Sequence, residues 1–120
     1  MSSEESLFVK DEKYWAEFSH YLYNYLFDHF KKFYNLELTM AEAVHLRNVI
    51  KKVIDEKKQG TLEAGSYETE VITRFFREYF GVDIVSYFSN ANKDQKEREK
   101  RARQLGEYIK KTVRPEMEMI

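Results

Sequence analysis

One stretch of the chain, residues 11–35, concentrates aromatic side chains in a way that few folds can accommodate. It contains ten aromatic residues and neither proline nor glycine, so it can run as about seven turns of uninterrupted α-helix. At about 100° per residue, its apolar side chains cover roughly 240° of the helix circumference, whereas a surface helix needs a stripe of about 100°. The narrow polar strip that remains consists of Glu17, His20, Asn24, Asp28 and Lys31. Such a helix has to be covered on at least two sides.

We therefore predict an all-α fold, a small bundle of four main helices and one short helix arranged around the helix of residues 11–35. The apolar face of this helix has a centre and two flanks. The centre consists of Trp15, Phe18, Leu22, Tyr25, Leu26 and Phe33. One flank consists of Tyr14 and Tyr21, and the other consists of Tyr23, Phe27, Phe30 and Tyr34.

The flanks of this helix are the predicted partner-binding surface. Two neighbouring helices cover most of a face of roughly 240°, but they leave one flank bare. Soluble monomers tend to avoid a large exposed apolar patch. One flank is therefore expected to contact a second copy of the chain or another protein, and the candidate residues are Tyr14, Tyr21, Tyr23, Phe27 and Tyr34.

Capping residues mark the ends of the other predicted helices. Thr39 and Glu42 have the spacing of a capping box at the start of a second helix, and Gly60 is a suitable residue for the end of that helix. The short connection to the aromatic helix favours an antiparallel hairpin of the two. A third helix is expected between Ser66, as its N-cap, and Gly81, as its stop.

The C-terminal third is predicted to form a short helix and a longer one. Asp83 can cap a short helix over residues 84–88. This segment is also rich in strand-forming residues, but no other stretch offers it a strand partner. The last helix is expected over residues 93–113, after a capping box at residues 92–95 and with Pro115 as its end. Its second half is expected to pack on the bundle through Ala102, Leu105, Tyr108, Ile109 and Val113.

Length and composition are those of a single soluble globular domain spanning residues 1–120. The chain is 42% hydrophobic and 34% charged, and we predict a flexible lead over residues 1–10 and a C-terminal tail over residues 115–120. The first residues carry no signal-peptide pattern, no stretch is long and apolar enough for a membrane span, and cysteine is absent. These features predict a cytoplasmic protein without disulfides.

The last predicted helix carries an excess of positive charge. Residues 93–114 include nine basic and four acidic residues, a net charge of +5, whereas the whole chain has a net charge of −1. One interpretation is nucleic-acid binding through phosphate contacts, and its candidate residues are Lys96, Arg98, Lys100, Arg101 and Arg103. The other is an exposed helix stabilised by its own i,i+4 ion pairs, namely Asp94–Arg98, Glu97–Arg101 and Glu99–Arg103. We favour the second interpretation.

Residues with catalytic or metal-binding chemistry are sparse. In an antiparallel hairpin of the first two helices, His29, Glu42 and His45 would come to a similar level, but a closed metal site needs more ligands than these. The glycines are scattered and form no phosphate-binding loop, and no serine has the context of a hydrolase nucleophile. We therefore predict no enzyme activity, no cofactor, no metal and no small-molecule substrate.

The sequence thus predicts a non-enzymatic helical protein that binds or assembles through protein–protein contacts, as a homodimer or as part of a larger complex, and without a membrane. The first alternative is a nucleic-acid-associated protein that uses the basic last helix. The second alternative is a metal-binding helical bundle.

Overall fold

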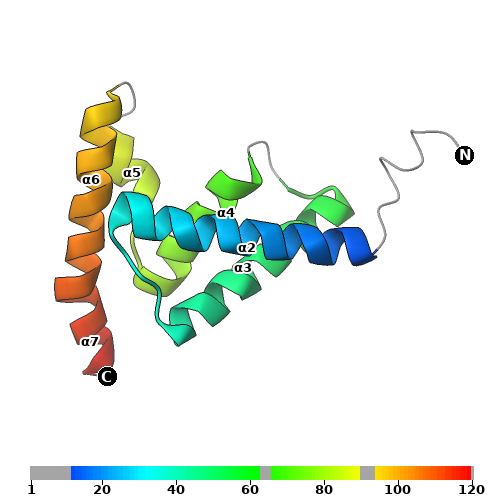
Figure 1. The fold of residues 1–120 in the computed structure, drawn as a ribbon, viewed down its shortest axis with the longest axis horizontal. Coiled ribbons are helices and arrows are strands. Elements are labelled where there is room, and N and C mark those ends of the chain that lie inside the picture. The colour runs from blue at the N-terminus through cyan, green and yellow to red at the C-terminus, as the bar shows by residue number, and fades with distance from the viewer. Residues whose placement is uncertain (1–11, 63–65, 90–93, 120) are drawn as a thin grey trace, which may run out of the picture.

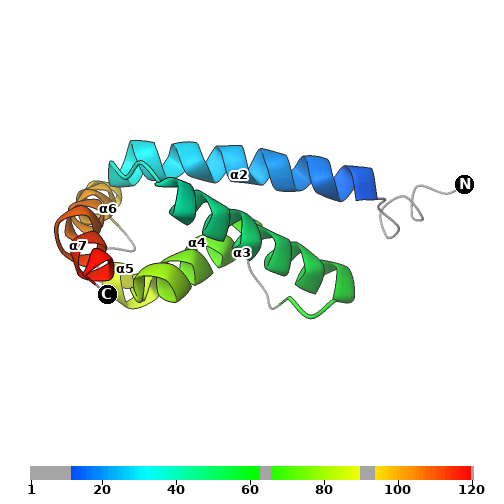
Figure 2. The same cartoon turned by 90° about the horizontal axis from the view of Figure 1, so that it is seen from below.

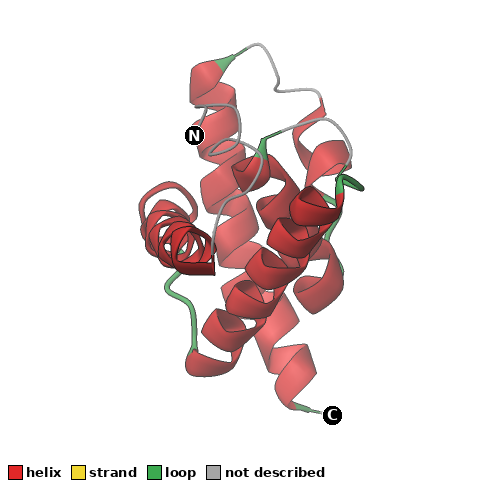
Figure 3. Cartoon of the chain, turned by 90° about the vertical axis from the view of Figure 1, so that its right-hand side faces the viewer, coloured by secondary structure: helices red, strands yellow, loops and turns green. Residues whose placement is uncertain are grey.

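The computed structural model describes residues 12–62, 66–89 and 94–119, and every regular element in these ranges is a helix. Figure 3 shows these helices joined by short loops. The longest is α2 (Glu12–Tyr34), which crosses the molecule (Figure 1) and is contacted by several of the other helices. The prediction of an all-α bundle around this helix is confirmed. The predicted lead, residues 1–10, lies outside the described residues.

α2 ends where a left-handed residue turns the chain back. Asn35 has a φ of 52°, a conformation that asparagine tolerates better than most residues do. The Leu36 N–H donates to the Phe30 carbonyl oxygen at 3.0 Å, a bond that spans this turn. Leu36 and Leu38 are buried, so the connection to the next helix also contributes to the core.

α3 (Met40–Gln59) forms the predicted antiparallel hairpin with α2, and the two helices diverge toward the N-terminal end of α2 (Figure 2). The predicted capping box is present. The Glu42 N–H donates to Thr39 Oγ1 at 3.2 Å, and the Thr39 N–H donates to Glu42 Oε1 at 2.9 Å. Gly60 ends the helix in the left-handed conformation with a φ of 74°, so both ends of α3 are where capping chemistry predicts them.

Thr39→Ala is expected to lower the free energy of unfolding by about 1 kcal/mol, because the Glu42 N–H loses the hydroxyl that caps it. Thr39→Ser keeps a hydroxyl at this position and is expected to stay close to the wild type. Urea denaturation followed by circular dichroism measures both changes. An unfolding midpoint that Thr39→Ala leaves unchanged would contradict the role of this residue in starting α3.

α4 (Tyr67–Phe75) and the π-helical segment η1 (Phe76–Phe80) together form the third predicted helix. Ser66 caps its start by accepting from the Thr69 N–H at 3.1 Å, and Gly81 ends it with a φ of 70°. The π turn was not predicted. The residues around it that enter the core are Phe75, Phe76 and Phe80.

An ion-pair network joins α4 to α3. Arg74 donates from Nη2 to Glu56 Oε1 at 2.7 Å and from Nε to Glu70 Oε1 at 2.8 Å, and its Nη1 also contacts Glu56 Oε2. The hydrogen bond from Arg74 lowers the pKa of the Glu56 carboxyl, and the same bond raises the pKa of Arg74.

α5 (Ile84–Phe88) is the predicted short helix. Asp83 caps it, because its Oδ1 accepts from the Val85 N–H at 3.1 Å. The alternative of a β-strand for this segment is wrong. A strand would need a neighbouring strand for its backbone hydrogen bonds, and the described ranges contain none.

The last helix is longer than predicted. It consists of α6 (Gln95–Tyr108), the π-helical segment η3 (Ile109–Val113) and α7 (Arg114–Glu118). The prediction that Pro115 ends the helix is therefore wrong, and most of the predicted tail is helical. Pro115 stands in the first turn of α7, after the π segment, where a missing N–H is tolerated best.

The start of α6 agrees in part with the prediction. Asp94 is its N-cap, with Oδ1 accepting from the Lys96 N–H at 3.0 Å. Asn92 and Lys93, the first two residues of the predicted capping box, lie outside the described residues. The first two turns are mostly exposed, whereas the second half packs on the bundle as predicted.

The buried side of α2 differs from the predicted one. Its fully packed residues follow one i,i+4 row, namely Leu22, Leu26, Phe30 and Tyr34. Tyr25 and Phe33, which the helical wheel placed in the centre of the apolar face, are instead nearly half exposed. The contacting helices α3, α4 and α6 leave this side of α2 uncovered. Tyr108 of α6 was also predicted to pack, but it is exposed and Gly106 is buried in its place.

Two contacts dock the last helix at the C-terminal end of α2 and the start of α3. Gly106 lies so close to Tyr34 that an added Cβ would be 1.7 Å from the Tyr34 carbonyl oxygen. Arg114 donates to both carboxylate oxygens of Glu42, at 2.9 and 2.6 Å, and to the Glu37 carbonyl oxygen at 2.8 Å. Docking therefore depends on shape at one point and on charge at the other.

Candidate protein–protein interface

A row of aromatic side chains runs along the uncovered side of α2, and we call it the aromatic stripe. It consists of Tyr14, Tyr21, Tyr25, His29 and Phe33. The four tyrosine and phenylalanine residues are 40%, 60%, 47% and 41% exposed in chain order. From Tyr21 to Phe33, successive rings lie i,i+4 apart with centroid distances of 6.3, 6.0 and 4.7 Å. They form a continuous row of ring contacts on the helix surface.

His29 behaves as an aromatic member of the stripe. It is half-buried, and burial lowers the pKa of its imidazole, an effect that the carboxylate of Asp28 partly opposes. Burial thus favours the neutral form of the imidazole over the charged form.

A groove of about 460 Å³ lies beside the Phe33 end of the stripe, between α2, α4, α5 and α6. Besides the aromatic side chains of α2, its apolar lining consists of Ile72, Ile84, Val85, Phe88 and Ala102. Tyr34 also lines it, and burial raises the pKa of this phenol to about 12, although the Arg98 guanidinium opposes the shift. The groove gives the stripe a concave end in which a partner side chain can be buried.

The opposite flank of α2 is covered by the chain's own helices. Tyr23 and Phe27 are half-buried against the core, and Tyr34 lies within it. Arg47 of α3 stacks over the Tyr23 ring, with its Cζ 4.2 Å from the centroid, a cation–π contact. Of the five partner-binding candidates, Tyr14 and Tyr21 thus lie on the exposed side of the helix. Tyr34 is 6% exposed and reaches the surface only where it lines the groove.

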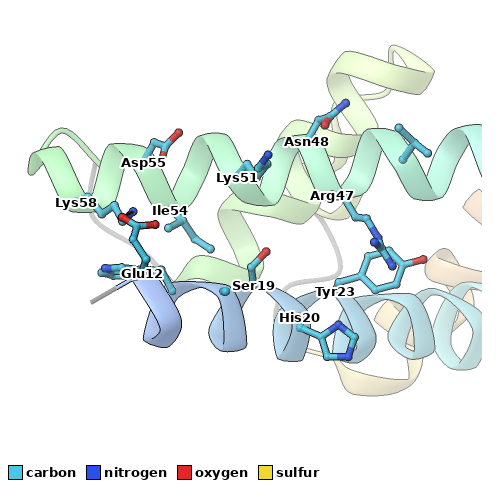
Figure 4. Close-up of a pocket in the computed structure, with 13 residues that line it drawn as sticks. Glu12, Ser19, His20, Tyr23, Arg47, Asn48, Lys51, Ile54, Asp55 and Lys58 are labelled. Carbon is cyan, nitrogen blue, oxygen red and sulfur yellow. Dashed lines mark hydrogen bonds and ion pairs between the residues drawn. The ribbon is translucent and has the colours of Figure 1, made fainter. Parts of the chain in front are cut away.

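A second hollow, the α2–α3 cleft, has a volume of about 570 Å³ and lies where the two helices diverge. Figure 4 shows Arg47 and Lys58 extending from α3 across this cleft toward α2. Lys58 Nζ lies 3.3 Å from Glu12 Oε1 and 5.7 Å from the centroid of the Trp15 ring. A cationic side chain therefore lies at each end of the cleft, Arg47 beside the Tyr23 ring and Lys58 beside the Trp15 ring.

The five basic candidates of α6 do not share one surface. Lys96, Lys100 and Arg103 line a shallow hollow that also contains two glutamates. Arg98 instead faces the groove, and Arg101 donates to a backbone carbonyl of α5 at 2.9 Å. This dispersal weakens the case for a nucleic-acid site, which needs several cations along one path.

The predicted ion pairs of α6 are formed in part. Glu97 and Arg101 are paired at 3.5 Å. Asp94 is used as the N-cap, and Glu99 accepts from Gln95 Nε2 at 3.2 Å. Among the described residues, neither of these two acids pairs with the arginine expected from its spacing.

The three candidate metal ligands are not brought together. His29 belongs to the aromatic stripe, Glu42 is held by Arg114, and the His45 ring packs against Tyr79 at 5.0 Å. Over residues 12–62, 66–89 and 94–119, no group of three His, Cys, Asp or Glu side chains is arranged to hold a metal ion.

Comparison of the chain with protein-family models, curated proteins and solved structures found no match. Among the helices that the structure describes, none has both the length and the apolar character needed to cross a membrane.

Sequence reasoning missed part of the candidate interface. Tyr25 and Phe33 were assigned to the buried centre of the α2 face, although Tyr25 adjoins Tyr21 on the helical wheel. The groove residues come from three further helices that are distant in sequence. No pattern in the sequence relates them to one another.

Proposed function

We propose that the protein assembles as a homodimer in which the aromatic stripes of two copies pack against each other. The observation that carries this proposal is the exposure of three large aromatic side chains, Tyr21, Tyr25 and Phe33, on one side of α2. Soluble monomers rarely expose contiguous apolar patches, and protein interfaces are enriched in aromatic residues. The proposed function is therefore non-enzymatic assembly through protein–protein contacts.

The charges along α2 favour an antiparallel arrangement of the two stripes. Glu12, Lys13 and Glu17 in the N-terminal part of the helix sum to a charge of −1, and Asp28, Lys31 and Lys32 near its C-terminal end sum to +1. In an antiparallel pair related by a two-fold axis, the acidic end of each helix faces the basic end of the other. Opposed helix dipoles favour the same orientation, whereas a parallel pair would bring like charges together.

Aromatic packing supplies the main stabilisation in this arrangement. Tyr21 and Tyr25 lie near the middle of the stripe, so a two-fold axis there brings their rings against those of the second copy. Such aromatic pairs contribute about 0.5–1.5 kcal/mol each beyond the area that they bury. Phe33 and the adjoining groove then lie toward the ends of the interface, where they can receive side chains of the partner helix.

Tyr21→Glu combined with Tyr25→Glu is expected to convert the dimer into a folded monomer. The substitutions place carboxylates of both chains in the centre of the interface, where they would lose water without gaining a partner. Both tyrosines are about half exposed in the single chain, so the core is expected to stay intact. Sedimentation velocity measures the mass, and circular dichroism checks the fold.

Tyr108→Glu is the matched control, because Tyr108 of α6 is 47% exposed, as Tyr25 is, and lies outside the stripe. Its mass is expected to equal that of the wild type. A double variant that remains dimeric would exclude the stripe as the interface. If the wild-type chain stays monomeric and binds a different protein through the stripe, the proposed homodimer is wrong and the complex is a heteromer.

A further inference from the structure

The α2–α3 cleft combines an excess of positive charge with an apolar floor. Its cations are Arg47, Lys51 and Lys58, its acids are Glu12 and Asp55, and its large apolar residues are Trp15, Tyr23 and Ile54. Within the described ranges, neither Arg47 nor Lys51 forms an ion pair. Their charges are therefore available to an acidic group that enters the cleft.

The end of the last helix has the opposite character. Residues 115–119 contain no basic side chain, and both Glu116 and Glu118 are exposed. Met117 and Met119 alternate with them and are 37% and 86% exposed. Methionine adapts its shape to an irregular surface and makes favourable contacts with aromatic rings.

We propose that α7 of one copy docks in the α2–α3 cleft of a second copy. Side chains three positions apart share one side of a helix and those two positions apart do not, so Glu116 faces the cations of α3 with Met119 beside it, and Met117 and Glu118 lie on the other side of α7. Figures 1 and 2 show α7 and the diverging ends of α2 and α3 at opposite ends of the molecule, and the cleft lies between these two helices. The contact therefore joins two copies and does not form within one chain.

Charge selects the cleft over the groove as the site for this helix end. The groove is rimmed by Glu68 and Glu99 against the single cation Arg98, so it would repel an acidic segment. The cleft has three cations against two acids. The occupant that matches it in both charge and apolar content is α7 of another copy.

This contact is heterologous, because it uses a different surface on each of the two copies. It involves neither Tyr21 nor Tyr25, so it does not depend on the proposed homodimer. Where both contacts form, dimers are linked into larger assemblies. Where only the cleft contact forms, single chains are linked head to tail.

Two charge-reversal variants of the full chain test the contact. The cleft variant carries Arg47→Glu and Lys51→Glu, and the tail variant carries Glu116→Lys and Glu118→Lys. Either variant alone places like charges on the two sides of the contact, so its head-to-tail association is expected to weaken at least about tenfold. An equimolar mixture restores opposite charges at every contact, and it is expected to regain the wild-type mass distribution. Sedimentation velocity from micromolar to millimolar concentration measures the association.

The control is Lys100→Glu with Arg103→Glu, which reverses the same number of charges on α6 and is expected to associate as the wild type does. All substituted side chains are exposed, and circular dichroism checks that each variant is folded. Unchanged association of the cleft or tail variant overturns the proposal. The proposal is also overturned if the mixture does not regain the wild-type mass distribution, or if the wild type forms no head-to-tail species.

The Tyr21→Glu, Tyr25→Glu background separates this contact from the stripe dimer. There the cleft contact is expected to persist as concentration-dependent association of single chains, and the cleft substitutions are expected to remove it. Loss of the dimer with retained head-to-tail association supports both proposals. If the Tyr21→Glu, Tyr25→Glu variant still dimerises, and the cleft substitutions remove the head-to-tail species, only the role of the stripe is refuted.

Discussion

Arg114→Ala is expected to lower the free energy of unfolding by about 3–5 kcal/mol, the usual cost of removing one partner of a buried ion pair. The Glu42 side chain is 3% exposed and that of Arg114 is 21% exposed, so water does little to replace the lost contact. Arg114 binds both oxygens of the Glu42 carboxylate and also the Glu37 carbonyl oxygen. Without Arg114, the Thr39 N–H is the one hydrogen-bond partner of the Glu42 carboxylate that remains in the described structure.

Urea denaturation followed by circular dichroism tests this expectation, with two further variants for comparison. Arg103→Ala removes an exposed arginine from the same continuous helix and is expected to change stability by no more than about 0.5 kcal/mol. Arg114→Lys keeps the charge but loses the planar two-pronged contact, so it is expected to fall between the wild type and Arg114→Ala. A loss below about 1 kcal/mol for Arg114→Ala would contradict a buried, uncompensated Glu42.

Gly106→Ala is expected to destabilise the protein by about 1–3 kcal/mol or more, because the added methyl group has no space. Its Cβ would lie 1.7 Å from the Tyr34 carbonyl oxygen. The obstacle is backbone, so it cannot turn aside as a side chain would. α6 would have to move away from the end of α2, and the buried residues Leu105 and Ile109 would lose contacts.

The direction in which Gly106→Ala changes the stability distinguishes a steric clash from an ordinary helix substitution. In an unconstrained helix, replacing glycine with alanine stabilises by about 1 kcal/mol. Gln104→Ala is the control on the same helix, since Gln104 is exposed, and it is expected to be neutral or slightly stabilising. Thermal unfolding of the two variants should therefore shift in opposite directions or by clearly different amounts. A raised melting temperature for Gly106→Ala would exclude the close approach of α6 to α2.

Most helix boundaries were predictable from the sequence because capping is local. Thr39 bonds to residues three positions away, Ser66 does the same, and Asp83 caps a helix that starts at the next residue. Gly60 and Gly81 adopt the left-handed conformation for which glycine has no steric penalty. Each signal joins neighbours in the chain, so the rest of the fold is not needed to read it.

The same local rules failed at Pro115. A proline is expected to end a helix because it lacks an N–H and its ring clashes with the preceding turn. Here the helix continues through α7 after a π segment, and Arg114, the residue just before the proline, is anchored to Glu42. The anchor stabilises the end of the helix, and it comes from a residue far away in the sequence.

The candidate interface was predictable only in outline. The wheel of α2 shows that apolar side chains surround most of the helix, and both flanks were therefore candidates. It does not show where the neighbouring helices lie. The packing of α3, α4 and α6 covers Tyr23, Phe27 and Tyr34. It leaves Tyr21 and Tyr25 exposed.

The sequence by itself therefore determined the helical class, most helix ends and the presence of an overlong apolar face, because periodicity and capping involve residues within a few positions of one another. Only the tertiary structure decided which side of that face is left exposed, that Glu42 pairs with Arg114, and that Gly106 meets Tyr34. These contacts join residues 72 positions apart in the case of Glu42 and Arg114. Such pairs have no local pattern, because the chain between them sets their distance only after it has folded.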